Sequence, residues 1–207
     1  MRHISGSIYI PLYNDNRMAI ALAVGAGLAV LYATTRGPSN LVWVQSTTNN
    51  RKYLVQDLST KQDAANRMAT IHENIETLFR RYRDNPATAS EPRIQTMITR
   101  FDPSKLVEAN MTDSTTSYSE GKGEQIVLCL RQKTKGYPFA DLNTTMFVVL
   151  HEIAHLMTYS IGHTPEFWAN FRRILNDAVA SGIYTNVNYG HSPSVYCGLE
   201  INSTPLA

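Results

Sequence analysis

The chain has 207 residues, of which 43% are hydrophobic and 17% charged, and its formal net charge is +2. This length accommodates one folded domain of ordinary size plus an additional segment. The apolar content is too high for a disordered chain. A net charge so close to zero argues against a globally basic nucleic-acid-binding protein.

The first unusual element is an uncharged apolar run near the N-terminus. Residues 18–35 contain no charged side chain and lie between Arg17 and Arg36. As a helix of about 27 Å, the run nearly spans the roughly 30 Å hydrocarbon layer of a bilayer. It therefore predicts a single transmembrane anchor behind a tail of residues 1–17. A cleaved signal peptide and a buried soluble helix are the alternatives.

The charges beside the run bear on membrane orientation. Behind it stand Arg36, Arg51 and Lys52, and in front of it the two arginines are offset by Asp15. Cytoplasmic flanks of membrane helices are richer in Lys and Arg. This favours a single-pass protein whose C-terminal domain faces the cytosol, in a host-cell or virion membrane if the protein is viral.

The next elements are a linker and two helices. Residues 36–55 are polar and turn-rich around a short apolar run at 41–44, which predicts a linker with one short strand. A helix is predicted over 60–83, because apolar residues recur there at steps of three and four. His72 lies on its flank and is expected to face solvent. A shorter helix is predicted over 92–101.

A loop and a strand follow. Residues 111–123 are rich in Thr, Ser and Gly and are expected to form a loop. Residues 125–131, with the sequence QIVLCLR, are apolar and β-rich, which predicts a strand. Cys129 within it is expected to be a small core residue, with a ligand or nucleophile as the alternative. The two cysteines, Cys129 and Cys197, do not form a disulfide framework.

The segment that carries chemistry begins with a helix predicted over about 143–159. Its side chains are apolar nearly all round, so the helix is expected to be buried. Three of its residues, His151, Glu152 and His155, would be costly to bury without partners. The spacing of these three residues along the helix indicates what their partner is.

Residues four apart on an α-helix point the same way, so His151 and His155 can converge on one metal ion. Glu152 lies about 100° further round the helix, where it can reach a water held by that ion. This is the H-E-x-x-H pattern, which combines two imidazole ligands with a general base. Two neutral core histidines bonded to backbone groups are the structural alternative.

A catalytic zinc ion takes three protein ligands and leaves one position for water. His163 lies just after Gly162, at a corner where Thr164-Pro165-Glu166 has the form of a helix start. We therefore expect His163 to be the third ligand of one Zn²⁺ ion, although an ordinary turn residue fits the same position. Glu166 is the alternative ligand, or a residue that supports the site from behind.

Three further residues near the C-terminus are candidates to stabilise an oxyanion: His191, Tyr189 and Tyr196. Each carries a side chain that can donate a hydrogen bond to a developing negative charge. Each of them can also be a loop or core residue with no role in catalysis, so the sequence leaves their roles open.

The sequence HEIAH followed by GHTPEFW resembles the WLM and SprT-like zinc metallopeptidases, and residues 123–205 are similar to WLM-domain proteins of large DNA viruses. The resemblance implies that His151, His155 and His163 bind zinc and that Glu152 is the catalytic base. The seven residues between His155 and His163 form a longer spacer than many WLM proteins have.

Cellular relatives digest proteins crosslinked to DNA. Residues 141–207, however, carry two Lys or Arg against five Asp or Glu, so the charge does not support a nucleic-acid partner.

The fold expected for residues 56–207 is α+β, with the HExxH helix buried on a small antiparallel sheet and with flanking helices over 60–83 and 164–181. The leading hypothesis is a zinc metallopeptidase acting on polypeptides and anchored through residues 18–35. The strand over 125–131 is expected to pair with an extended substrate. The alternatives are a non-catalytic zinc-stabilised binding or virion-structural module and a hydrolase of a non-peptide substrate. The sequence does not indicate an oligomeric state.

Overall fold

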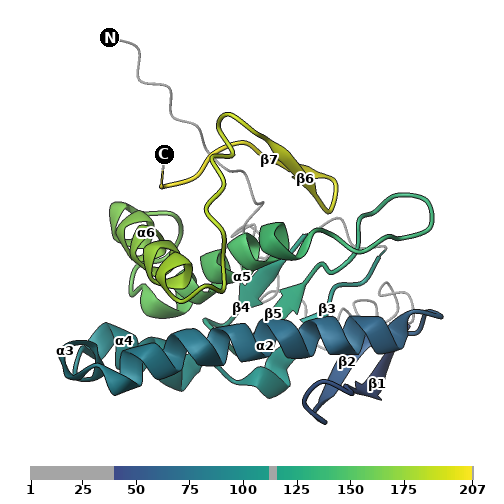
Figure 1. Cartoon of the computed structure of the whole chain (residues 1–207), viewed down its shortest axis with the longest axis horizontal. Coiled ribbons are helices and arrows are strands. Elements are labelled where there is room, and N and C mark those ends of the chain that lie inside the picture. The colour runs from purple at the N-terminus through teal and green to yellow at the C-terminus, as the bar shows by residue number, and fades with distance from the viewer. Residues whose placement is uncertain (1–39, 112–115, 207) are drawn as a thin grey trace, which may run out of the picture.

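A five-stranded mixed sheet organises the part of the chain that the computed structural model describes, residues 40–111 and 116–206 (Figure 1). Its spatial order is β1-β2-β3-β5-β4. The strands are β1 (Leu41–Gln45), β2 (Lys52–Gln56), β3 (Leu106–Glu108), β4 (Tyr118–Glu120) and β5 (Gln125–Leu128). The two outer pairings are antiparallel, and the β2–β3 and β3–β5 pairings are parallel.

The α+β class is confirmed, but the expectation of an antiparallel sheet is wrong. The helices between β2 and β3 form the long crossover that a parallel pair requires.

The hairpin of β1 and β2 lies where a linker was expected. The short strand expected near residues 41–44 is present as β1, but β2 was not expected, and both strands belong to the sheet. Tyr53 and Val55 of β2 are buried in the core, which explains why this segment is ordered against the domain.

The helices that follow agree with the sequence pattern. They are α2 (Lys61–Asp84), the short α3 (Pro86–Ala89) and α4 (Pro92–Arg100). The apolar face of α2 packs against β1 and β2 (Figure 1). His72 is a correction, because it is buried and its Nδ1 lies 2.9 Å from the Tyr53 hydroxyl. The hairpin covers the helix flank that was expected to face solvent.

The buried central helix is α5 (Leu142–Met157), and α6 (Pro165–Ala180) packs against it. The predicted burial of α5 is confirmed. Its N-cap is Asp141, just before the predicted start at 143, and the Asp141 carboxylate accepts the Thr144 N–H at 2.7 Å. The α6 start is as expected, with Thr164 as N-cap and Pro165 in the first turn. Since α4 and β4 also contact α5, the HExxH helix lies at the centre of the fold.

A buried ion pair connects the sheet with the start of α2. Arg131 donates through Nε to Glu108 Oε1 at 2.8 Å and through Nη1 to the Thr60 hydroxyl at 2.7 Å. The other Glu108 oxygen accepts the Gln56 backbone N–H at 2.7 Å. These bonds satisfy a buried charge pair whose isolated members would be costly.

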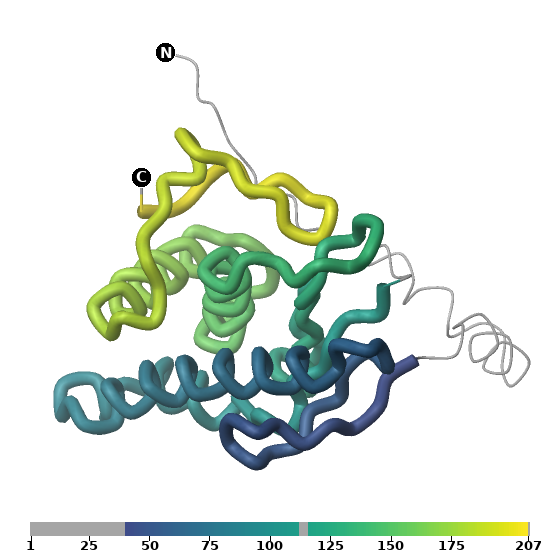
Figure 2. The backbone as a smooth tube through the Cα atoms, turned by 45° about the vertical axis from the view of Figure 1, so that its right-hand side comes forward, coloured from purple at the N-terminus to yellow at the C-terminus, as the bar shows by residue number. Residues whose placement is uncertain are grey.

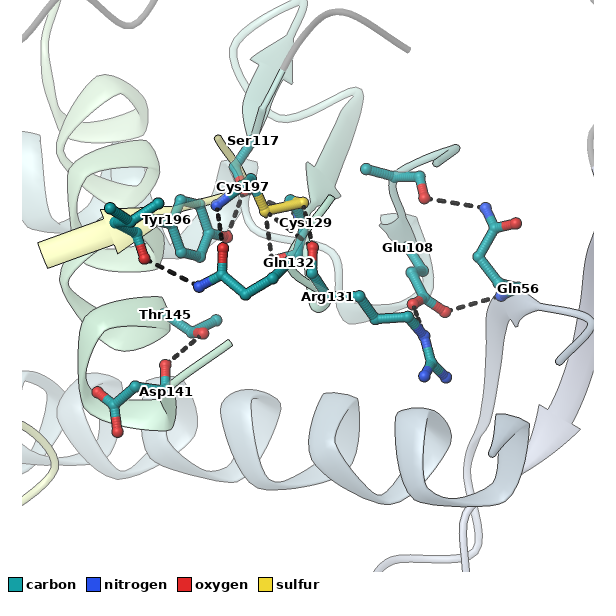
Figure 3. Close-up of a disulfide and its surroundings, with 12 residues drawn as sticks. Gln56, Glu108, Ser117, Cys129, Arg131, Gln132, Asp141, Thr145, Tyr196 and Cys197 are labelled. Atoms are coloured by element: carbon teal, nitrogen blue, oxygen red, sulfur yellow. Dashed lines mark hydrogen bonds and ion pairs between the residues drawn. A yellow bond between two sulfur atoms is a disulfide. The ribbon is translucent and has the colours of Figure 1, made fainter. Parts of the chain in front are cut away.

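The C-terminal hairpin of β6 (Ser194–Tyr196) and β7 (Leu199–Ile201) lies over the segment that follows β5 (Figure 2). Cys129 is buried in the core as expected, but a disulfide that was not expected joins it to Cys197 (Figure 3). Gln132 binds the same hairpin, accepting the Cys197 N–H and donating to the Val195 carbonyl, each at 2.9 Å.

The apolar run at residues 18–35 and the tail before it lie outside the described residues. Within residues 40–111 and 116–206, no helix combines the length and the hydropathy that crossing a membrane requires.

Candidate metal centre

The structure brings together the three histidines that the sequence singled out. His151 and His155 lie one turn apart on α5, with their Nε2 atoms 3.3 Å from each other. His163 follows the turn after α5, and its Nε2 lies 3.0 Å from that of His151. The ligand atoms of all three lie within 4.8 Å of one another. Three nitrogens that converge in this way form one face of a tetrahedral metal site.

An aromatic ring from α6 supports all three imidazoles. Phe167 stacks on His155 with ring centroids 4.3 Å apart, and its centroid lies 4.8 Å from that of His151 and 4.7 Å from that of His163. Phe171, one turn later on α6, also packs on His151, with ring centroids 5.1 Å apart. The sequence did not indicate that Phe167 contributes to the site. The signal that could have found it is its place in the first turn of the helix that begins directly after His163.

Burial keeps the three histidines neutral, which is the form that binds metal. It lowers the pKa of His155 to about 3, with His163 and Lys122 acting in the same direction. The pKa of His151 is well below its ordinary value, first because the ring is fully enclosed and then because of its two histidine neighbours. Burial also lowers the pKa of His163.

Glu152 lies beside the histidines, and its burial is only partly compensated. It is 1% exposed, and neither carboxylate oxygen has a hydrogen-bond partner among the described residues. Burial raises its pKa to about 8, which the neighbouring Ser119 backbone opposes only in part. An unsatisfied buried carboxyl group is costly. Next to three convergent nitrogens, it fits the place of a base that acts on a metal-held water. The donor set and this carboxyl group therefore fit a zinc site.

Glu166 is not among the three groups that converge. Its carboxylate accepts the N–H groups of Tyr159 and Ser160 and the Ser160 hydroxyl, the last at 2.7 Å. Arg93 lies 3.3 Å from it on the other side. The structure thus places Glu166 behind the loop that carries His163, and not at the ligand position.

The three C-terminal candidates lie in different surroundings. Tyr196 is buried, its hydroxyl lies 2.7 Å from Ser117 Oγ, and its pKa is raised by burial and by the nearby Glu152. Tyr189 packs on Phe147, one turn before His151, with ring centroids 4.8 Å apart. His191 is exposed in a loop near Asn188 and lies outside the histidine group among the described residues. Tyr196 is therefore the candidate that the structure brings close to Glu152.

Known proteins resemble this chain over most of its length. A protein of Acanthamoeba polyphaga mimivirus, described as uncharacterised, is 31% identical over 189 residues, which cover 90% of this chain and 95% of that protein. An uncharacterised protein of Invertebrate iridescent virus 6 is 23% identical over 177 residues, covering 82% of this chain and 92% of that protein.

Among solved structures, Wss1 from Saccharomyces cerevisiae is similar with a TM-score of 0.47 and 20% identity, covering 61% of this chain and 85% of that one. Residues 93–193 match the WLM domain family. With a viral relative that matches nearly the whole chain, this confirms the resemblance drawn from the sequence. The chain belongs to the WLM domain family and is related to proteins of large DNA viruses.

Proposed function

We propose that this protein is a zinc-dependent metallopeptidase that hydrolyses peptide bonds with Glu152 as general base. The observation that carries the proposal is the convergence of three neutral imidazoles beside an enclosed carboxyl group that has no partner of its own among the described residues. Membership of the WLM family supports the same chemistry. His151, His155 and His163 are the residues that would hold the zinc ion.

A zinc ion bound there would lower the pKa of a coordinated water and polarise the scissile carbonyl. Glu152 accepts a proton from the attacking water as the new C–O bond forms. It then donates that proton to the amine nitrogen as the C–N bond breaks. The enclosed position of Glu152 suits this exchange, because burial raises the pKa of its carboxyl group and so makes the carboxylate a stronger base.

An extended substrate can pair only with an edge strand of the sheet. The pairing expected for the strand over 125–131 is excluded for β5, because β5 lies between β3 and β4. The edge strands are β1 and β4, and of these β4 carries Ser119, which lies beside Glu152. We therefore assign substrate pairing to β4, where backbone hydrogen bonds would align the peptide with the base.

The test compares zinc-loaded full-length protein with its Glu152→Gln variant on an unfolded protein substrate. We expect the variant to bind as much zinc and to cleave about 10²- to 10⁴-fold more slowly, the usual contribution of a general base. Glu200→Gln, which changes an exposed carboxylate on β7, is the matched control and should keep full activity. Equal cleavage by wild type and Glu152→Gln would rule out this role for Glu152.

A non-catalytic zinc-stabilised module is the second candidate, and the enclosure of Glu152 and His151 favours it. A structural zinc site is closed on all sides, whereas a catalytic one keeps a position open. His155 and His163 are only partly buried, so one side of the group reaches solvent, and this favours the enzyme. Stoichiometric zinc without cleavage by the wild type would instead support the module.

Location in the cell is a separate proposal. The anchor at residues 18–35 stays a prediction, with the polypeptide substrate on the same side as the domain. The flanking charges favoured the cytosol, but disulfides persist in oxidising compartments and at virion surfaces. The Cys129–Cys197 disulfide therefore supports an oxidising location for the domain.

A further inference from the structure

The loop between α5 and α6, residues 158–164, carries the third histidine and is held from one side by a lysine. Lys122 Nζ donates to the carbonyl oxygens of Thr158 at 3.0 Å, Tyr159 at 2.6 Å and Ser160 at 3.3 Å. These carbonyls follow the end of α5, where the helix dipole favours a cation. One ammonium group thus binds three successive peptide groups of this loop.

The opposite side of the same loop is held by a carboxylate. Glu166 accepts the N–H of Tyr159 at 3.3 Å and that of Ser160 at 3.1 Å. Arg93 lies 3.3 Å from Glu166 and keeps that carboxylate in place. Tyr159 and Ser160 therefore have both their N–H and their carbonyl groups bound by charged side chains of opposite sign.

The backbone that carries Lys122 is placed with little freedom. Lys122 lies in the turn between β4 and β5, where Gly121, Lys122 and Gly123 have φ values of 56°, 53° and 110°. A Cβ atom at Gly123 would lie 2.5 Å from both the Arg100 carbonyl oxygen and Leu156 Cδ2. The turn thus lies directly against the end of α5, and only glycine permits so close an approach. This contact fixes the lysine beside the loop.

We propose that Lys122, with Glu166, is a positioning residue that holds His163 ready to bind the metal. The inference rests on the proposed metal binding by the three histidines. His151 and His155 are fixed by their helix, whereas His163 depends on its loop. A loop that had to become ordered during metal binding would lose conformational entropy at that step and weaken the complex. The contacts of Lys122 and Glu166 order the loop when the protein folds.

The experiment measures the zinc affinity of the full-length chain by competition with a chromophoric chelator. We expect Lys122→Met to weaken zinc binding about tenfold, the scale seen when groups that support metal ligands are removed. Lys122→Arg keeps a cationic donor and should recover part of the loss. Lys105→Met, at an exposed lysine of the same charge, is the matched control and should leave the affinity unchanged.

A double-mutant cycle with His163→Ala separates positioning from general stability. If Lys122 acts through His163, Lys122→Met should have no further effect on zinc affinity once His163 is replaced. Glu166→Gln serves in the same cycle if Lys122→Met does not fold. An equal loss in both backgrounds, or an affinity unchanged by Lys122→Met, would overturn the proposal.

The outcomes also separate this inference from the proposed function. A protein that binds zinc with the expected order of affinities but cleaves no peptide would overturn the peptidase and leave the positioning role in place. Cleavage with an unchanged affinity in Lys122→Met would do the reverse. A wild type that binds no zinc would overturn both.

Discussion

His72 shows how a single polar residue can depend on the whole fold. It is 4% exposed, its Nδ1 lies 2.9 Å from the Tyr53 hydroxyl, and its ring lies 6.2 Å from that of Phe101. Burial lowers its pKa, and Arg51 acts in the same direction, while Glu76 and Glu73 oppose them. The folded protein therefore holds His72 neutral.

This lowered pKa predicts a loss of stability in acid. The unfolded chain takes up a proton at His72 near its ordinary pKa of 6.5, whereas the folded chain does so only at lower pH. The free energy of unfolding should therefore fall as pH drops below about 6.5, by up to about 1.4 kcal/mol for each unit of pKa difference. Urea unfolding of the wild type and of His72→Gln, each at about pH 7.5 and at about pH 5.5, measures this loss of unfolding free energy.

Both proteins are studied with a chelator present, so the three site histidines contribute equally and cancel in the comparison. Gln can accept the Tyr53 hydroxyl but does not titrate, so the variant should lose less stability in acid than the wild type. The same pH dependence in both proteins would show that His72 does not carry the effect.

Whether a residue of the candidate site could be found from the sequence depends on how near to it in the chain the segments that position it lie. His151, Glu152 and His155 could be found from the sequence, because helix geometry fixes their relation within a few residues. His163 could be found from the corner before α6. Lys122, which approaches from the turn between β4 and β5, could not be found in this way, because only the packing of that turn against α5 brings it there.

At the scale of elements, length decides what the sequence can predict. The helices α2, α4, α5 and α6 are long enough for a period of three to four residues to be visible, and their predicted ranges are confirmed. Most of the strands that were not predicted, namely β3, β4, β6 and β7, have three residues each, and β4 lies inside the expected loop at 111–123. Three residues cannot display alternation. The five-residue β2 was also missed, inside the expected linker. The parallel pairings join segments far apart in the chain, which local patterns do not encode.

The β4–β5 turn gives a prediction at this scale. Gly123→Ala should lower the free energy of unfolding by about 2 kcal/mol or more, because the new Cβ adds a clash with α5 and the end of α4 to the strain of a positive φ. Gly136→Ala is the matched control. Its φ is +85°, but nothing lies within 4 Å of the added atom, so it reports the backbone strain alone.

Urea unfolding of the two glycine variants separates clash from strain. We expect the Gly123 variant to lose clearly more stability than the Gly136 variant. Equal losses would mean that the turn moves away from α5 at little cost, and that its close approach does not fix the position of Lys122.

On the scale of the whole molecule, the C-terminal hairpin is joined to the sheet by covalent and polar contacts together. The Cys129–Cys197 disulfide connects positions 68 residues apart. Near it, the Tyr196 hydroxyl lies 2.7 Å from Ser117 Oγ, and Gln132 bonds the hairpin backbone (Figure 3). The pairing of two cysteines at this separation is a property of the tertiary fold, so the sequence pattern alone did not predict it.

Closing so long a loop restricts the unfolded chain, which predicts a large effect of reduction. The chain-entropy relation gives about 4 kcal/mol for a loop of this length. Urea unfolding of the wild type should therefore shift to lower urea when a reductant is added. The Cys129→Ala, Cys197→Ala double variant should resemble the reduced wild type and be insensitive to reductant.

Since none of the three histidines lies on the hairpin, zinc affinity should survive reduction under native conditions. Unfolding of oxidised and reduced wild type at the same urea concentration would contradict a stabilising disulfide, and would remove the argument for an oxidising compartment.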